Sequence, residues 1–128
     1  MNSFEKQAIE FFKEYQSIFD TGDMSTFSKL FSEPFISVRP DGNVQSMPTN
    51  KTASTFFSSV QKKWQEEGYS SFSTKDFKVI PIGANSMLVT FTWEMLDKEK
   101  KLIREWRQSY NLLSRNKSWS VITSTFHA

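Results

Sequence analysis

Arg39 is an arginine at the end of an apolar run, where its guanidinium needs a hydrogen-bond acceptor. It ends the apolar run FSEPFISVR (residues 31–39), directly before a proline. Alternation with a period of two puts Phe35, Ser37 and Arg39 on one face of a strand. A guanidinium on a buried face needs a carboxylate, a phosphate or another acceptor. Two interpretations stay open: Arg39 forms a structural ion pair with an aspartate or glutamate, or it binds the anionic group of a ligand.

Aromatic and amide side chains that could line the same cavity lie on one helix and two strands. Tyr15 is on the apolar face of the first expected helix, where it is either a hydrogen-bond donor to a ligand or an ordinary core tyrosine. Trp93 belongs to one alternating strand, and the next strand carries Trp106, Gln108 and Tyr110 on one face. A buried amide among aromatic rings fits a mixed cavity lining better than dry packing. Core packing alone also accounts for the two tryptophans.

Composition excludes several kinds of catalytic and metal site. The chain has no cysteine, so it has no disulfide, no thiolate nucleophile and no thiolate metal site. The single histidine, His127, precedes the last residue, where an exposed imidazole is expected rather than a catalytic one. Asp41 and Asp97 fall in expected turns, and the four glycines form no phosphate-binding loop. We therefore predict no metal and no cofactor, the catalytic residues are unknown, and whether the chain is an enzyme stays open.

Length and charge indicate one domain, residues 1–128, and limit its partners. Sixteen basic and fourteen acidic residues leave a net charge of +2, too small to suggest nucleic-acid binding. The N-terminus has no signal-peptide pattern, and no run reaches the roughly 18 to 20 apolar residues of a membrane span. We expect a soluble cytoplasmic protein that binds neither nucleic acid nor membrane.

Hydrophobic periodicity predicts the order of the elements. Apolar residues at three- and four-residue spacings predict three helices, over residues 3–20, 23–32 and 50–66. The period then changes to two, which predicts four strands, over residues 71–80, 87–96, 102–113 and 118–126. Together with a short strand pair after the second helix, this order predicts an α+β fold, with a curved sheet and helices against its inner side.

Three features together resemble the nuclear transport factor 2-like superfamily: the run YQSIFDTGDMSTFSKLFSEPFISVRPDG (residues 15–42), the helix and meander that follow, and the terminal SWSVITSTFHA (residues 118–128). Within the superfamily, the chain is most similar to SnoaL-like and ketosteroid-isomerase-like orphan proteins. The resemblance implies a cystatin-like cone, in which three N-terminal helices pack on the concave face of a strongly bent mixed or antiparallel sheet. Such a cone-shaped half-barrel has a pocket at its wide end. Because the fold hosts isomerases, cyclases and oligomerisation domains, it does not assign the chemistry.

Comparison with ketosteroid isomerase bears on three positions. Tyr15 matches the oxyanion-hole tyrosine of that enzyme. The aspartate base of the enzyme matches Arg39, which cannot remove a proton near neutral pH. The second oxyanion acid falls near Gln108 or Ser109, neither of them acidic, so steroid isomerisation is not expected. The comparison implies that the strand face carrying Arg39 faces the pocket. The ligand-binding residues that we predict are Tyr15, Arg39, Trp93, Trp106, Gln108 and Tyr110.

Two classes of function remain open. The first is a small-molecule pocket protein that binds, or converts, an apolar or aromatic compound with an acidic or carbonyl group. The second is a non-catalytic protein-interaction or oligomerisation module built on the same fold. A cavity of several hundred cubic ångströms beside Arg39 favours the first class, and a filled cone favours the second.

The outer face of the expected meander bears on self-association. It carries polar side chains: Thr90, Thr92, Glu94, Glu105, Arg107 and Ser109. Cones of this superfamily commonly pair sheet to sheet, so the resemblance implies a homodimer through this face. The polarity of the face predicts a hydrated, hydrogen-bonded interface.

Overall fold

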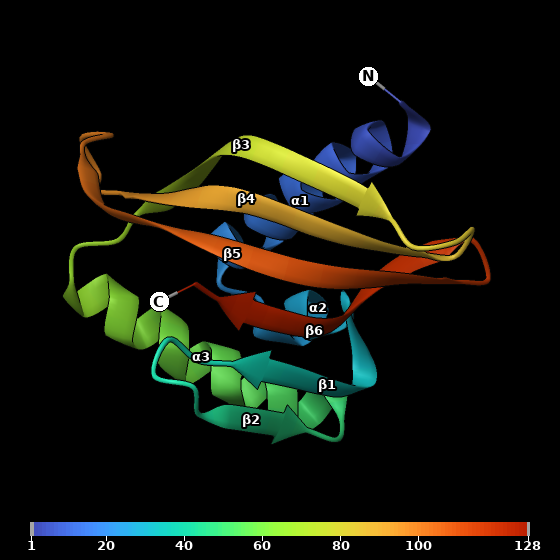
Figure 1. Cartoon of the computed structure of the whole chain (residues 1–128). Helices are drawn as coiled ribbons and strands as arrows, with labels where there is room; N and C mark the ends of the chain where they lie inside the picture. Colours follow the sequence, from blue (N-terminus) through green and yellow to red (C-terminus); the bar gives the residue numbers. More distant parts are fainter. Residues whose placement is uncertain (1, 128) are drawn as a thin grey trace.

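Helices and strands follow one another along the chain in the order shown by the colours of Figure 1. The computed structural model describes residues 2–127. The helices are α1 (Ser3–Thr21), α2 (Met24–Ser28) and α3 (Asn50–Glu66). The strands are β1 (Phe31–Val38), β2 (Val44–Met47), β3 (Ser71–Pro81), β4 (Ser86–Leu96), β5 (Leu102–Arg115) and β6 (Ser118–Phe126). None of the helices within residues 2–127 combines the length and apolar character needed to cross a membrane.

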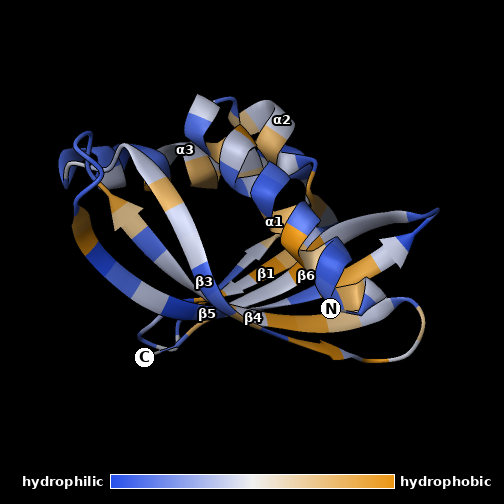
Figure 2. Ribbon diagram, turned by 90° about the horizontal axis from the view of Figure 1, so that it is seen from above, coloured by the Kyte–Doolittle hydropathy of each residue, from blue (hydrophilic) through white to orange (hydrophobic). Residues whose placement is uncertain are grey.

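The strands of the described chain form one six-stranded sheet in the order β2-β1-β6-β5-β4-β3. Strands β3 to β6 make an antiparallel meander, and β1 pairs antiparallel with β2 and parallel with β6. The sheet is strongly bent, and the helices lie on its concave side (Figure 2). The predicted α+β fold with a mixed sheet is confirmed. The parallel pairing of β1 with β6 positions the site, because it places residues 36–38 beside residues 123–125.

Polar side chains at the helix ends set where the helices begin. Asn2 accepts a hydrogen bond from the backbone N–H of Glu5 at 2.8 Å, so it caps α1. Gly22 adopts φ 81° and donates its N–H to the carbonyl of Phe19, which ends α1 in the left-handed conformation that glycine favours. The side chains of Asp23 and Thr49 cap α2 and α3 in the same manner as Asn2. The predicted end of the first helix near residue 20 and the predicted start of the second near residue 23 are confirmed.

The second helix is shorter than the 23–32 range that its periodicity predicts. It ends at Ser28, and β1 already begins at Phe31. The carbonyl of Leu30 accepts a hydrogen bond from the N–H of Val121 at 2.9 Å, and Phe31 pairs with Val121 across the sheet. Backbone pairing with β6 therefore replaces the last turn of the helix, although the apolar spacing continues through it.

Aromatic side chains fill most of the concave side of the sheet. The ring of Phe12 on α1 lies 4.7 Å from that of Phe91 and 4.6 Å from that of Tyr110. Phe27 of α2 lies 5.0 Å from Phe57 of α3. The inward face of β4 is buried as its alternation predicts: Met87, Val89, Phe91, Trp93 and Met95. Because these rings pack against one another in tilted and edge-on contacts, they stabilise the core and leave little open space.

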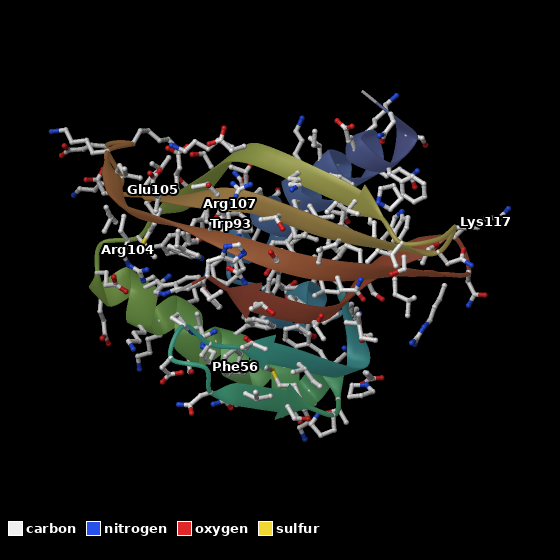
Figure 3. The ribbon with its side chains drawn as sticks, viewed as in Figure 1. Phe56, Trp93, Arg104, Glu105, Arg107 and Lys117 are labelled. Carbon is white, nitrogen blue, oxygen red and sulfur yellow. The ribbon has the colours of Figure 1, made fainter. Side chains whose placement is uncertain are left out.

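Polar side chains cover the outer face of the meander and pair with one another. The Lys75 ammonium lies 2.9 Å from a carboxylate oxygen of Glu105 and 3.4 Å from one of Glu94. Arg107 donates from Nη1 to the hydroxyl of Thr92 at 3.1 Å. Figure 3 shows Glu105 and Arg107 on the face of the sheet turned away from the helices. The alternation of β4 and β5 thus sorts the two faces as predicted.

A buried hydrogen-bond cluster joins the C-terminal end of α1 to α3 and to the start of β3. The hydroxyl of Tyr69 donates to the carboxylate of Asp20, and Gln61 donates from Nε2 to the carbonyl of Phe19 at 2.7 Å. Burial raises the pKa of Asp20, and the hydrogen bonds from Tyr69 and from the backbone of Phe72 only partly oppose the rise. Burial likewise raises the pKa of Tyr69. The folded state therefore favours the protonated form of Asp20.

This shift predicts a pH-dependent effect of Asp20→Asn. A raised carboxyl pKa gives a stability contribution that is present below the unfolded pKa of about 3.9 and is lost as the pH rises through the folded pKa. The asparagine keeps an acceptor for Tyr69 but carries no charge. Urea denaturation should show Asp20→Asn more stable than wild type at pH 7, with a difference that shrinks toward pH 4. The exposed Glu14→Gln on α1 is the control, and a loss of stability in Asp20→Asn at pH 7 would contradict the expectation.

Candidate functional site

A cavity lies between the C-terminal half of α1, the inner side of α3 and strands β1, β6 and β5. All six residues predicted from the sequence line it: Tyr15, Arg39, Trp93, Trp106, Gln108 and Tyr110. Its volume is about 40 Å³. Ligand sites for drug-sized compounds typically enclose about 300 to 1,000 Å³. The chain thus brings the predicted residues together around a space much smaller than the several hundred cubic ångströms expected of a small-molecule site.

Arg39 lies at the rim of the cavity, half-buried among aromatic rings. Its backbone is held by the β1–β2 hairpin, where its N–H donates to the carbonyl of Asn43 at 2.8 Å. The guanidinium carbon lies 4.5 Å from the ring centroid of Phe126 and 5.5 Å from that of Phe56. Burial lowers the pKa of Arg39, and the charge of Asp41 partly opposes that change. An arginine stays protonated near neutral pH despite such a shift.

The structural ion pair between Arg39 and an aspartate or glutamate, one of the two open interpretations, is not found among residues 2–127. Among residues 2–127, the salt bridges are those of Lys75, Lys101 and Arg104, and no aspartate or glutamate forms an ion pair with Arg39. Its contacts with Phe56 and Phe126 are of the cation–π kind, worth about 0.5 to 2 kcal/mol depending on desolvation. They leave the N–H groups of the guanidinium available for an acceptor.

Three hydrogen-bonding side chains meet at the deep end of the cavity. The indole N–H of Trp93 donates to the hydroxyl of Tyr110 at 2.8 Å. The ring of Tyr15 lies 5.8 Å from that of Tyr110 and 5.6 Å from that of Trp93. Burial raises the pKa of both tyrosines, which keeps them as neutral phenols. The hydroxyls of Tyr15 and Tyr110 hydrogen-bond to each other, so one phenol proton of the pair is left for another acceptor. The role of Tyr15 as a donor to a ligand stays a prediction.

Trp106 and Gln108 act together on the β5 side of the cavity. The indole N–H of Trp106 donates to Gln108 Oε1 at 3.0 Å. Because this contact occupies the oxygen, it turns the NH₂ group of the carboxamide into the donor that remains. The Trp106 ring stacks on that of Phe126, with centroids 6.0 Å apart and planes 27° apart. Trp106 therefore orients Gln108 and also forms part of the wall.

Arg104 does not line the cavity, although it precedes Trp106 by two positions on the same side of β5. Its side chain is exposed at the end of the strand, where Nε donates to Glu67 Oε1 at 3.0 Å. Figure 3 shows it near the end of β5 where that strand begins. Its guanidinium lies 4.7 Å from the ring of Trp106. An ion pair with the end of α3 holds it outside.

Two serines that were not among the predicted ligand-binding residues lie in the cavity lining. Ser37 of β1 and Ser124 of β6 are 2% and 4% exposed, and they are paired across the sheet. Within residues 2–127, neither hydroxyl has a hydrogen-bond partner, and no buried polar atom is sealed off without one, so both oxygens face the cavity space. The alternation of β1 put Ser37 on the face of Arg39, which was the available signal. The sequence gives no comparable signal for Ser124. Its place beside Ser37 depends on the pairing of β1 with β6, which the sequence does not show.

The lining contains no group suited to proton abstraction. Among the described residues, no aspartate, glutamate or histidine borders the cavity, and no three of the usual metal-ligating side chains gather closely enough to hold a metal ion. His127 is exposed on the outer face, with Nε2 2.8 Å from the hydroxyl of Ser109. Asp41 and Asp97 accept backbone hydrogen bonds in their turns, which confirms their predicted role. The site is built to bind oxygen atoms with neutral donors and one cation.

The sequence of the chain matches one protein family. Residues 5–128 match the family model described as NTF2-like protein (DUF6841). The chain belongs to this NTF2-like family. Membership confirms the predicted relationship to the nuclear transport factor 2-like superfamily, whereas the SnoaL-like subgroup stays a prediction. No curated protein matches the sequence.

Solved structures share the fold of this NTF2-like chain but little of its sequence. Aln2 from a Streptomyces species has a TM-score of 0.78 at 10% identity, with 99% of this chain and 91% of that chain covered. An NTF2-like protein from Cytophaga hutchinsonii has a TM-score of 0.74 at 16% identity, with 100% and 99% covered. An NTF2-like protein with a cystatin-like fold from Novosphingobium aromaticivorans has a TM-score of 0.75 at 10% identity, with 97% and 80% covered. At these identities the likeness shows the fold and leaves the function unassigned.

The absence of an ion pair at Arg39 within residues 2–127 predicts the stability of Arg39→Met. Deleting the charge removes the cation–π contacts but also removes the cost of a half-buried guanidinium, so the free energy of unfolding should change by less than about 1 kcal/mol. Urea denaturation measures this change. A loss of about 3 kcal/mol or more in the free protein would instead reveal a carboxylate partner stranded by the substitution.

Proposed function

We propose that this NTF2-like chain is a small-molecule pocket protein that binds a compound with an acidic or carbonyl group and an apolar or aromatic body. The observation that carries the proposal is Arg39 at the rim of the cavity, half-buried and with no carboxylate paired to it among residues 2–127. A guanidinium that has lost part of its hydration gains from an anion more than the same group in water does. A ligand carboxylate is the partner that fits this position.

The neutral donors around the cavity support the same class of ligand. The amide of Gln108 and one phenol of the hydrogen-bonded pair Tyr15 and Tyr110 offer hydrogen bonds to oxygen without adding negative charge that would repel an anion. Phe56 and Trp64 on α3 and Phe126 on β6 offer an apolar rim for the body of the ligand. Binding is proposed here, and conversion of the ligand is not, because the lining formed by the described residues has no general base.

Matched arginine variants test the proposed function. Thermal melts would compare wild type, Arg39→Met and the control Arg115→Met, which removes an exposed arginine at the far end of β5. The ligands would be benzoate and phenylacetate, with benzamide as the uncharged comparison at equal ionic strength. A charge-assisted hydrogen bond contributes about 1.5 to 3 kcal/mol, so Arg39→Met should bind the acids roughly ten- to a hundred-fold more weakly, and Arg115→Met should match wild type. Equal ligand-induced shifts in wild type and Arg39→Met would remove Arg39 from the site.

A second candidate function is favoured by the size of the cavity. A space of about 40 Å³ is close to a filled cone, and a filled cone fits a protein-interaction or oligomerisation module. In this case the outer sheet face is the contact surface. The polar network of Lys75, Glu94 and Glu105 lies there, and two copies related by a two-fold axis would meet through hydrated polar groups.

Sedimentation tests the homodimer that this face is proposed to form. At tens of micromolar, wild type should sediment at twice the chain mass of 14.9 kDa. Glu105→Lys places a second cation beside Lys75 and should shift the protein toward the single-chain mass, whereas Lys62→Glu on the exposed side of α3 should leave it paired. A wild type that sediments as a single chain would contradict a homodimer.

A further inference from the structure

Two rows of polar side chains cross the concave face of the sheet within the cavity. The deeper row consists of Ser37, Ser124 and Tyr110, which are direct neighbours on β1, β6 and β5. The row nearer the rim consists of Arg39, whose guanidinium lies over Phe126, and of Gln108, which pairs with Phe126. Successive inward residues on a strand are about 6 to 7 Å apart, so the two rows are separated by about that distance.

The deeper row contains donors that the protein itself leaves unused. Ser37 and Ser124 are 2% and 4% exposed, and within residues 2–127 no side-chain hydrogen bond of their hydroxyls is found. Because no buried polar side-chain atom of the described residues lacks a partner, these two oxygens are open to the cavity. A hydroxyl that opens into a cavity can pair with an oxygen of water or of a ligand. A serine hydroxyl can donate to a carbonyl oxygen and can also exchange hydrogen bonds with a ligand hydroxyl.

The rim row binds a different group. Arg39 brings a positive charge, and Gln108 presents an NH₂ group because its oxygen is occupied by the indole of Trp106. Two donors of this kind on either side of the Phe126 ring suit the two oxygens of a carboxylate. The cavity therefore has a charged subsite at its rim and a neutral oxygen subsite at its floor.

The volume limits what can connect these two subsites. About 40 Å³ corresponds to about three enclosed water molecules. The faces of Trp93 and Trp106 are already in contact with neighbouring rings, Phe72 and Phe91 for the first and Phe126 and Trp64 for the second. A narrow acyclic chain requires these rings to separate less than a ring system does, because its cross-section is smaller.

We propose that the ligand of this cavity is a short acyclic oxo- or hydroxycarboxylate, with its carboxylate at Arg39 and Gln108 and its second oxygen at the Ser37–Ser124 pair. This inference rests on the proposed function and narrows it, because it requires two oxygen groups in one ligand and excludes an aromatic body from the interior. The spacing of the rows favours a second oxygen on the carbon three bonds from the carboxylate carbon.

Isothermal titration with three matched acids tests the proposal on the wild-type chain alone. The acids are 4-oxopentanoate, 4-hydroxypentanoate and pentanoate, which share length and charge and differ in the second oxygen. Each of the first two should bind about two- to ten-fold more tightly than pentanoate, the gain of one neutral hydrogen bond. Equal affinities for the three acids, or tighter binding of benzoate than of 4-oxopentanoate, would overturn the inference and leave the proposed function standing. Failure of every acid to bind would overturn both.

Serine variants test whether the preference for 4-oxopentanoate over pentanoate comes from Ser37 and Ser124. In Ser37→Ala/Ser124→Ala the preference for 4-oxopentanoate over pentanoate should fall to about one, while pentanoate binds as in wild type. Without ligand, the double variant should melt close to the wild-type temperature, because the substitutions remove no hydrogen bond between side chains of the described residues. Ser118→Ala, an exposed serine at the start of β6, is the control and should keep the preference. A preference that survives in the double variant would place the second oxygen elsewhere.

Discussion

The packing of the aromatic face of α1 against the concave side of the sheet is the contact on which the rest of the structure depends. Phe12 lies against Phe91 and Tyr110, and its presence fills the part of the cone nearest the N-terminal half of the helix. The bend of the sheet is required for this contact, because a flat sheet would touch the helix along one line only. The cavity lies where the C-terminal half of α1 faces α3.

That arrangement gives the cavity its distribution of polarity. Aromatic rings line it from α1, α3 and strands β3 to β6. Apart from Gln16 on α1, its amide, serine and arginine side chains come from β1 and the residue after it, β5 and β6. In such a surrounding, an arginine with no internal carboxylate is unfavourable unless water or a ligand supplies an acceptor. Arg39 keeps its charge half-buried without a carboxylate partner among residues 2–127, whereas Arg104 forms an ion pair with Glu67. The two arginines therefore differ in what they can bind.

Much of the fold and part of the site could be predicted from the sequence. Period-two alternation assigned the inward faces of β4 and β5, and the resemblance then brought Tyr15 and Arg39 to the same pocket. The end of α2 could not be predicted, because the pairing of Phe31 with Val121 is a long-range contact that overrides a helical pattern. Ser124 and the volume of the cavity were missed for a related reason. Which strands become neighbours, and how closely rings pack, depends on contacts between residues distant in sequence.

Nuclear magnetic resonance of the arginine side chains tests most directly the claim that Arg39 binds an acidic ligand. The chain has four arginines, at positions 39, 104, 107 and 115, so four Nε–H signals can be assigned by substitution. During titration with 4-oxopentanoate or benzoate at constant ionic strength, the Arg39 signal should shift and saturate while the other three stay in place. An Arg39 signal that no acid moves, or that moves only together with those of the exposed arginines, would contradict the account.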